Sequence, residues 1–183
     1  ATSIMLLVER GNLRIHDKFG RYIDAFNQND KEAVTIFEML THQAGFVPDT
    51  PLSEYSDPDR IWPLLWQQKL KYPPTTKFVY SDVGFQMLGK LVEKQSGQSL
   101  NAFTRTNIFE PLGMTETGFL PDERLRARAA TTEQREGRWM QGEVHDPRSY
   151  AMGGVAGHAG LFSTAADLAR YAEMILGRGE YAG

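Results

Sequence analysis

Cysteine is absent from the 183 residues of this chain, which excludes disulfide bonds, thiol catalysis and zinc sites built on cysteine. Long hydrophobic runs are absent too: no stretch approaches the roughly 18–20 apolar residues of a membrane-spanning helix, so no transmembrane segment is expected. Basic residues are not in excess, because 20 lysines and arginines face 23 acidic residues and the net charge is −3. Without a basic patch, nucleic acid is not an expected partner.

The composition is that of an ordinary globular domain, with 41% hydrophobic and 23% charged residues. The length suffices for one domain with a hydrophobic core. Residues 4–8 are apolar soon after Ala1, which indicates a helix already under way where the sequence begins. A signal peptide would lie upstream, so the sequence leaves the choice between cytoplasm and periplasm open.

Hydrophobic periodicity predicts a mainly helical chain. The clearest helix covers residues 82–95, with Ser81 as its N-cap and Gly97 at its end. Residues 46–59 are expected to form a surface loop, and residues 121–146 a loop with up to two short strands. Further helices are expected at residues 2–9, 35–42, 61–70, 101–109 and 165–176.

A tyrosine stands immediately before the clearest helix. Tyr80 precedes the N-cap Ser81 and the first helical residue, Asp82. A phenol with a pKa of about 10 is a poor base at neutral pH, but the positive end of a helix dipole and a nearby ammonium group favour its anion. Such a tyrosine could carry a proton to and from a serine hydroxyl. The alternative is a half-buried tyrosine that only packs against the helix start.

Glycines dominate residues 153–160, which read GGVAGHAG. Glycine lets a backbone turn sharply and approach a ligand closely, and His158 within this stretch could donate a hydrogen bond or exchange a proton near pH 7. The alternative is a tight connection with an exposed histidine. Phosphate binding is not indicated, because no Lys-Ser or Lys-Thr pair follows the glycines.

The other three histidines are weaker candidates. His42 lies at the end of the helix predicted over residues 35–42, where a histidine can cap carbonyl groups and interact favourably with the helix dipole. His16 and His145 have no ligand-like spacing to other histidines or to acidic pairs. We therefore expect neither a metal site nor a cofactor.

Five short sequence segments are more informative together, in their order along the chain, than any one of them alone. They are LVERGNL at residues 7–13, TIFEMLTHQAG at 35–45, YSDVGF at 80–85, FEPLGM at 109–114 and GHAGLFSTAADLA at 157–169. Together they resemble the serine β-lactamase and penicillin-binding-protein superfamily. The tyrosine is most similar to the branch of class C β-lactamases, D,D-peptidases and related esterases, and residues 144–146 and 157–160 resemble a penicillin-binding-protein-4B-like subgroup.

The resemblance implies an α+β parent fold, of which this chain is mostly the helical region with few short strands. It implies one partial domain over residues 1–183, without the N-terminal Ser-x-x-Lys segment and the C-terminal Lys-Thr-Gly-like strands. Family members attack a carbonyl with the serine of Ser-x-x-Lys and form an acyl-enzyme. Tyr80 matches the tyrosine of the family's Tyr-x-Asn motif, which assists proton transfer.

Substrate contacts follow from the same resemblance for Ser81, Asp82, His158 and Gly160. Asp82 stands where the family has asparagine, and a carboxylate cannot donate the amide hydrogen bond. This difference leaves an ester or peptidoglycan-like substrate open beside a β-lactam. Ser3 begins no Ser-x-x-Lys motif, so the chain as given lacks the nucleophile and is expected to be inactive alone.

These features predict part of a serine hydrolase acting on β-lactam or D-alanyl peptide-like substrates. One alternative is a family esterase for small esters, and another is a catalytically inactive binding or scaffold module. The expected partner is a small molecule or a peptidoglycan peptide, and a fragment with exposed apolar surface could self-associate. The resemblance implies a periplasmic or extracytoplasmic location, although a cytoplasmic one stays open.

Overall fold

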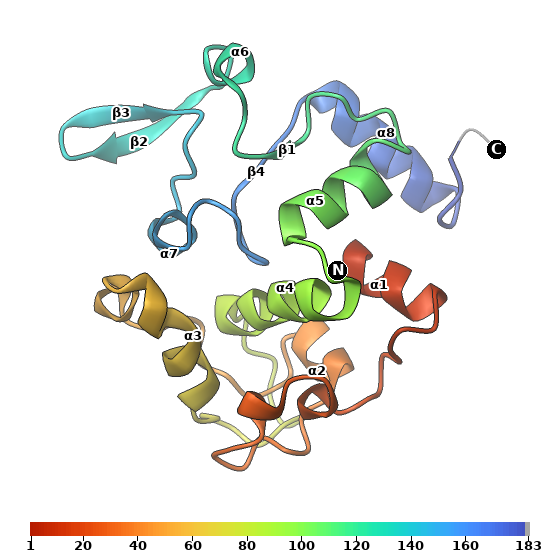
Figure 1. The fold of residues 1–183 in the computed structure, drawn as a ribbon, viewed down its shortest axis with the longest axis vertical. Helices are drawn as coiled ribbons and strands as arrows, with labels where there is room; N and C mark the ends of the chain where they lie inside the picture. The colour runs from red at the N-terminus through yellow and green to blue at the C-terminus, as the bar shows by residue number, and fades with distance from the viewer. Residues whose placement is uncertain (182–183) are drawn as a thin grey trace. The chain divides into compact units, whose positions relative to one another are not determined.

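The computed structural model describes residues 1–181, and the chain divides into two compact units. The first unit comprises Ala1–Leu100 and Ala156–His158, and the second comprises Asn101–Val155 and the chain from Ala159 onward. The helices and strands are labelled in Figure 1. Within the described residues, no helix combines the length and the apolarity that crossing a membrane requires.

The central helix of the first unit is α4 (Asp82–Ser96). The Ser81 side chain caps its first turn, and Gly97 ends it with a φ of +69°. Its buried face packs against α1 (Thr2–Glu9) and α2 (Ile36–Leu40) (Figure 1). Both the predicted cap and the predicted end are confirmed, and α4 is one residue longer than expected.

A capping box begins α2. The Thr35 hydroxyl accepts a hydrogen bond from the Glu38 amide, and the Glu38 carboxylate accepts one from the Thr35 amide at 2.7 Å. The predicted start is confirmed, while the helix ends at Leu40, two residues early. Before α2 the chain forms two 3-10 turns, η1 (Phe19–Arg21) and η2 (Asp24–Phe26).

Helix α3 (Pro58–Gln67) begins three residues before the helix predicted at 61–70. Asp57 is its N-cap, with the side chain accepting from the Asp59 amide, and Pro58 occupies the first turn. A proline there costs no helical hydrogen bond, because the first amides have no partner within the helix. The helix therefore starts earlier than predicted because Asp57 caps it and Pro58 fits its first turn, whereas the prediction assigned both residues to a loop.

Residues 46–59 are less exposed than predicted. They contain the 3-10 turn η3 (Leu52–Tyr55), and Thr50 and Tyr55 are buried. The Tyr55 hydroxyl donates to the Gln86 side chain of α4 at 2.7 Å, and the Thr50 hydroxyl bonds to Tyr55 at 3.1 Å. The prediction of a surface loop is therefore wrong for this part, because a buried polar network fixes it to the central helix.

The fully buried side chain of Lys31 holds the end of α3. Its ammonium donates to the carbonyl oxygens of Trp66 and Gln68 at 2.5 and 2.8 Å and lies 5.1 Å from the centre of the Phe26 ring. Burial lowers the pKa of Lys31 from 10.5 to about 8, against a smaller opposing effect of Glu32.

We expect Lys31→Met to leave both carbonyl oxygens without their donor and to lower the free energy of unfolding by roughly 1–3 kcal/mol at neutral pH. The folded pKa of about 8 lies below the unfolded value of 10.5, so between these values the unfolded chain binds more protons and the wild type gains stability as pH rises. Urea unfolding across this window should show a widening gap between wild type and variant. A gap that stays constant or narrows would contradict the expectation.

The second unit contains both helical and extended segments. Its helical elements are α5 (Leu100–Thr104), the π-helical turn η4 (Arg105–Phe109), α6 (Glu123–Arg126), α7 (Pro147–Ala151) and α8 (Ala165–Leu176). Together α5 and η4 confirm the helix predicted at 101–109. Its strand pairs are antiparallel, β1 (Gly118–Phe119) with β4 (Leu161–Phe162) and β2 (Thr131–Arg135) with β3 (Arg138–Gln141) (Figure 1).

The β2–β3 hairpin turns at Glu136 and Gly137, whose positive φ angles of +52° and +78° suit a two-residue hairpin loop. Residues 121–146 thus hold the two short strands that the sequence allowed. They also hold α6, which was not predicted. The Asp122 side chain caps this short helix by accepting from the Leu125 amide at 2.8 Å.

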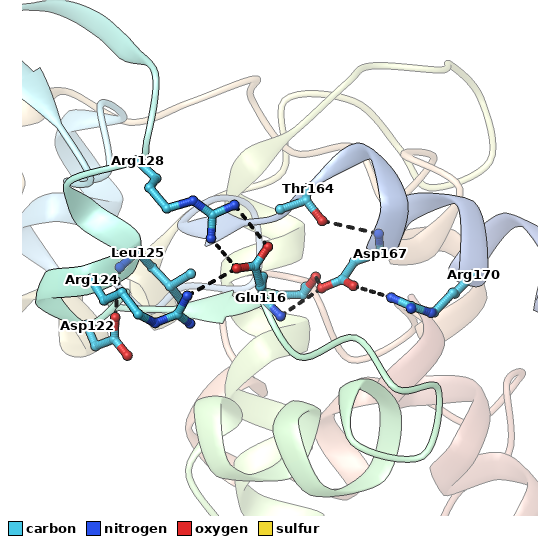
Figure 2. A network of polar contacts seen from close by, with 9 residues as sticks. Glu116, Asp122, Arg124, Leu125, Arg128, Thr164, Asp167 and Arg170 are labelled. Atoms are coloured by element: carbon cyan, nitrogen blue, oxygen red, sulfur yellow. Dashed lines mark hydrogen bonds and ion pairs between the residues drawn. The ribbon is translucent and has the colours of Figure 1, made fainter.

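A buried carboxylate ties α8 to the loop before β1 (Figure 2). Thr164 is the N-cap of α8 and accepts a hydrogen bond from the Asp167 amide. The Asp167 carboxylate accepts from the Glu116 amide at 2.8 Å and the Thr117 hydroxyl at 2.9 Å, and it pairs with Arg170 at 2.7 Å. These partners compensate the loss of water around a nearly inaccessible charge.

Two arginines from the α6 region meet the side chain of Glu116 in the same network (Figure 2). Arg128 and Arg124 both bond to its carboxylate and lower its pKa, with Arg128 the larger cause. Because both arginines are largely exposed, water screens these ion pairs and they contribute little stability.

Asp167→Asn keeps the shape of the side chain but removes its charge and one acceptor oxygen, so we expect a loss of roughly 1–3 kcal/mol in the free energy of unfolding. The control is Glu110→Gln, which breaks the exposed pair with Arg105 and should change stability by less than about 0.5 kcal/mol. Chemical denaturation of both variants tests the contrast. Equal losses would show that burial of Asp167 does not strengthen its interactions.

Candidate active site

Tyr80 lies on an extended stretch that leads into α4, with Ser81 as the cap that follows it. Its side chain is 60% exposed, so the phenol is accessible from solvent and its burial is small. Its ring lies against the His42 ring, with centroids 4.7 Å apart. The residue proposed for proton transfer is therefore accessible at the amino end of the central helix, where the helix dipole is positive.

The backbone on both sides of Tyr80 is fixed by hydrogen bonds to His42. The Val79 amide donates to the His42 carbonyl oxygen at 2.9 Å, and the Ser81 amide donates to His42 Nδ1 at 3.1 Å. The Ser81 hydroxyl donates to the Val47 carbonyl oxygen at 2.7 Å and accepts from an amide in the first turn of α4. This hydroxyl thus makes two hydrogen bonds within the folded chain, and its predicted contact with substrate stays a prediction.

The backbone conformation and the ring contacts of His42 suit it to hold the segment around Tyr80 in place. Its φ of +57° lies in the left-handed region, and its ring stacks on Phe85 at 4.9 Å and meets Phe78 edge-on at 5.8 Å. Burial lowers the pKa of His42, with smaller opposing effects from Asp82 and from the Ser81 amide. The predicted role as a cap on helix carbonyls is therefore wrong, because the ring nitrogen Nδ1 instead accepts a hydrogen bond from the Ser81 amide.

Asp82 is the first residue of α4, and its amide donates to the Pro48 carbonyl oxygen at 2.9 Å. Its carboxylate and a ring nitrogen of His158 lie within 4.8 Å of each other. Two of the predicted substrate-binding side chains are thus brought together from positions far apart in the sequence. Their contact with a substrate stays a prediction.

The glycine at 157 explains how His158 reaches this place. A Cβ on Gly157 would lie 1.9 Å from the Phe85 carbonyl oxygen and 2.9 Å from the Gly89 amide nitrogen. The backbone therefore rests directly on α4, which the glycines permit. Gly160 belongs to the second unit, where its φ is +118° and an added Cβ would lie 2.4 Å from the Gly154 carbonyl oxygen. Both glycines approach the chain's own backbone.

Gly157→Ala should lower the free energy of unfolding by about 1–3 kcal/mol, because neither clashing atom belongs to a flexible side chain. Gly84→Ala is the matched control, because Gly84 lies on α4, the helix against which Gly157 packs. Its new Cβ would make only ordinary contacts at 3.9 Å, and alanine favours a helix interior by up to about 1 kcal/mol. Thermal unfolding should move in opposite directions for the two variants, and a Gly157→Ala chain as stable as the wild type would refute the packing argument.

The family profile described as "Beta-lactamase" matches residues 1–183, the whole chain. The chain therefore belongs to the β-lactamase family, which confirms the superfamily resemblance.

Two curated relatives align with nearly all of this chain. The chain is 31% identical over 210 residues to "N-acetylmuramyl-L-alanine amidase" of Bacillus subtilis (strain 168), covering 98% of this chain and 47% of that protein. It is 32% identical over 209 residues to "Putative D-alanyl-D-alanine carboxypeptidase" of Escherichia coli (strain K12), covering 98% and 48%. The chain thus spans about half the length of the curated relatives it matches.

Solved structures confirm the predicted fold class. The octameric penicillin-binding protein homologue from Pyrococcus abyssi matches with a TM-score of 0.74 and 26% identity, covering 97% of this chain and 42% of that one. A class C β-lactamase from Rhodobacter sphaeroides matches with a TM-score of 0.79 and 22% identity, covering 99% and 49%. This chain accordingly has the mostly helical part of a β-lactamase-like fold, with few short strands.

Proposed function

We propose that the protein containing this chain is a serine hydrolase that forms an acyl-enzyme on β-lactam or D-alanyl peptide-like substrates, with Tyr80 as its proton carrier. The observation that carries this proposal is the accessible phenol fixed ahead of α4. Family membership supports the reaction class. The printed names of the two curated relatives, an amidase and a carboxypeptidase, support an amide bond in a cell-wall peptide as the bond that is cleaved.

The reaction requires a serine hydroxyl, which the family places in a Ser-x-x-Lys motif that this sequence does not contain. The serine oxygen attacks the substrate carbonyl carbon while its proton passes to the Tyr80 phenolate. Tyr80 then gives this proton to the leaving nitrogen as the carbon–nitrogen bond breaks, and the acyl group stays on serine as an ester. Water releases the acyl group, with Tyr80 accepting the proton of water and returning it to serine.

The amino end of α4 supports this role, because its positive partial charge favours the phenolate that accepts the first proton. Asp82 is proposed as a polar contact for a substrate group that donates a hydrogen bond, or for holding a lysine, since a carboxylate only accepts. Ser81, His158 and Gly160 are proposed as further substrate contacts. The parent domain would add the segments with the Ser-x-x-Lys and Lys-Thr-Gly-like motifs.

Two alternatives lead to different measurements. A family esterase for small esters is favoured by Asp82 in the asparagine position, and it would hydrolyse a nitrophenyl ester but no cephalosporin. A catalytically inactive binding or scaffold module would have neither activity, and the natural protein would lack Ser-x-x-Lys upstream of this chain. We also propose an extracytoplasmic location, by family, and self-association of the isolated chain.

The intact mass of the natural protein before and after incubation with a penicillin tests the acyl-enzyme directly. A gain of one penicillin would establish that a nucleophile is present and reacts. The isolated chain of 20.6 kDa should gain no mass, since it has no Ser-x-x-Lys. A natural protein that neither gains mass nor turns over a penicillin or an ester would refute the serine-hydrolase proposal.

Tyr80→Phe should slow acylation of the natural protein by roughly 10²–10⁴-fold, the usual contribution of a general acid–base group. The phenylalanine keeps the ring contact with His42 and removes only the hydroxyl. Tyr72→Phe, which removes another phenol of the same unit, is the control and should acylate like the wild type. Stopped-flow kinetics with a chromogenic cephalosporin compares the three proteins, and unchanged acylation in Tyr80→Phe would exclude the proton-transfer role.

A further inference from the structure

We propose that His42 is the positioning residue for Tyr80 and that it acts only while its imidazole is neutral. This inference rests on the proposed function, because it gives a purpose to the placement of the Tyr80 phenol. His42 touches neither the substrate carbonyl nor the serine in this proposal. It acts on the reaction through the segment that carries Tyr80.

The contacts of His42 lie on both sides of Tyr80. The His42 carbonyl oxygen accepts from the residue before it, Val79, and the ring Nδ1 accepts from the residue after it, Ser81. The face of the same ring lies against Tyr80 itself, at 4.7 Å between centroids. Three consecutive residues are therefore held by one histidine.

Such bracing matters because Tyr80 has little burial of its own. Tyr80 is 60% exposed, so close packing contributes little to its orientation, and its backbone and the contact with the His42 ring help to set its direction. A displacement of about 1 Å in a reacting group can reduce turnover roughly a hundredfold. The hydrogen bond from the Ser81 amide to His42 Nδ1 thus affects the reaction rate through the position of Tyr80.

This hydrogen bond exists in only one protonation state. A neutral imidazole with its proton on Nε2 accepts at Nδ1, whereas an imidazolium has a proton on both nitrogens and would point an N–H at the Ser81 amide. Protonation of His42 would therefore break one of its three contacts with the Tyr80 segment. Burial lowers the pKa of His42 below its ordinary 6.5, which keeps the ring neutral at physiological pH.

The charged groups on the elements around His42 are consistent with a neutral His42 imidazole. Asp82 on α4 is the carboxylate that acts on the ring and partly opposes the lowered pKa. Glu38 of α2 is engaged with the Thr35 amide in the capping box, and the Lys77 ammonium lies over the Tyr72 ring. A ring nitrogen of His158 lies within 4.8 Å of the Asp82 carboxylate.

Two substitutions at His42 separate the acceptor from the ring. His42→Asn carries an amide oxygen on Cγ, as histidine carries Nδ1, and asparagine tolerates the left-handed φ of +57°. It keeps an acceptor for Ser81 but cannot titrate. His42→Phe keeps an aromatic ring between Tyr80 and Phe85 but has no acceptor.

The experiment measures kcat and KM of the natural protein across pH with a chromogenic cephalosporin or a nitrophenyl ester. We expect His42→Phe to lower kcat roughly 10–100-fold at neutral pH with KM nearly unchanged, because misplacement affects the chemical step. We expect His42→Asn to keep kcat within about threefold of the wild type. Its activity should extend to lower pH, because the decline below the His42 pKa is removed.

Each result decides the inference. A His42→Phe enzyme with wild-type kcat would overturn it, and so would a His42→Asn profile that coincides with the wild type on the acid side. If His42→Phe does not fold, as circular dichroism would reveal, the His42→Asn profile still decides. Tyr80→Phe separates the two proposals: full activity without the phenol refutes the proton-transfer role of Tyr80 in the proposed function, whereas a large loss there with none in His42→Phe refutes only the role of His42.

Discussion

The start of α4 is held by the hydrogen bonds of one residue, Ser81, and the arrangement of the candidate site depends on them. Its hydroxyl reaches the Val47 carbonyl oxygen and its amide reaches His42 Nδ1, so the helix start is joined to chain that lies 34 and 39 residues earlier. Together with the hydrogen bond from the Val79 amide to the His42 carbonyl oxygen, these bonds fix the direction of the extended stretch before α4. Tyr80 is largely exposed and its ring lies against the His42 ring, so the same arrangement places the phenol and leaves it accessible.

Helices with local caps are the part of the fold that the sequence predicts best. The starts at Ser81 and Thr164 were found because a cap forms within four residues and leaves a residue pattern. The start of α3 was missed by three residues, since its cap and first-turn proline resemble a loop. The burial of Tyr55 could not be predicted, because its partner Gln86 lies 31 residues away.

The same distinction applies to the site. Tyr80 is found by a local pattern, a tyrosine before a helix, and by family resemblance. The role of His42 depends on a contact across 39 residues, so the local rule for a histidine at a helix end placed it correctly after α2 but did not predict that its ring accepts from Ser81. The roles of Ser81, Asp82, His158 and Gly160 toward a substrate came from resemblance alone. The structure shows which contacts fix these residues in place. A structure with a bound substrate would show which substrate groups they contact.

The close approach of Gly157 to α4 constrains the order in which this chain can mature. Ala156–His158 belongs to the first unit, yet all of Asn101–Val155 is synthesised before it. A chain that emerges amino end first therefore lacks the contact of Gly157 with Gly89 while most of the second unit is still being made. The contact between Gly157 and α4 is therefore an interaction of the first unit that forms late in translation.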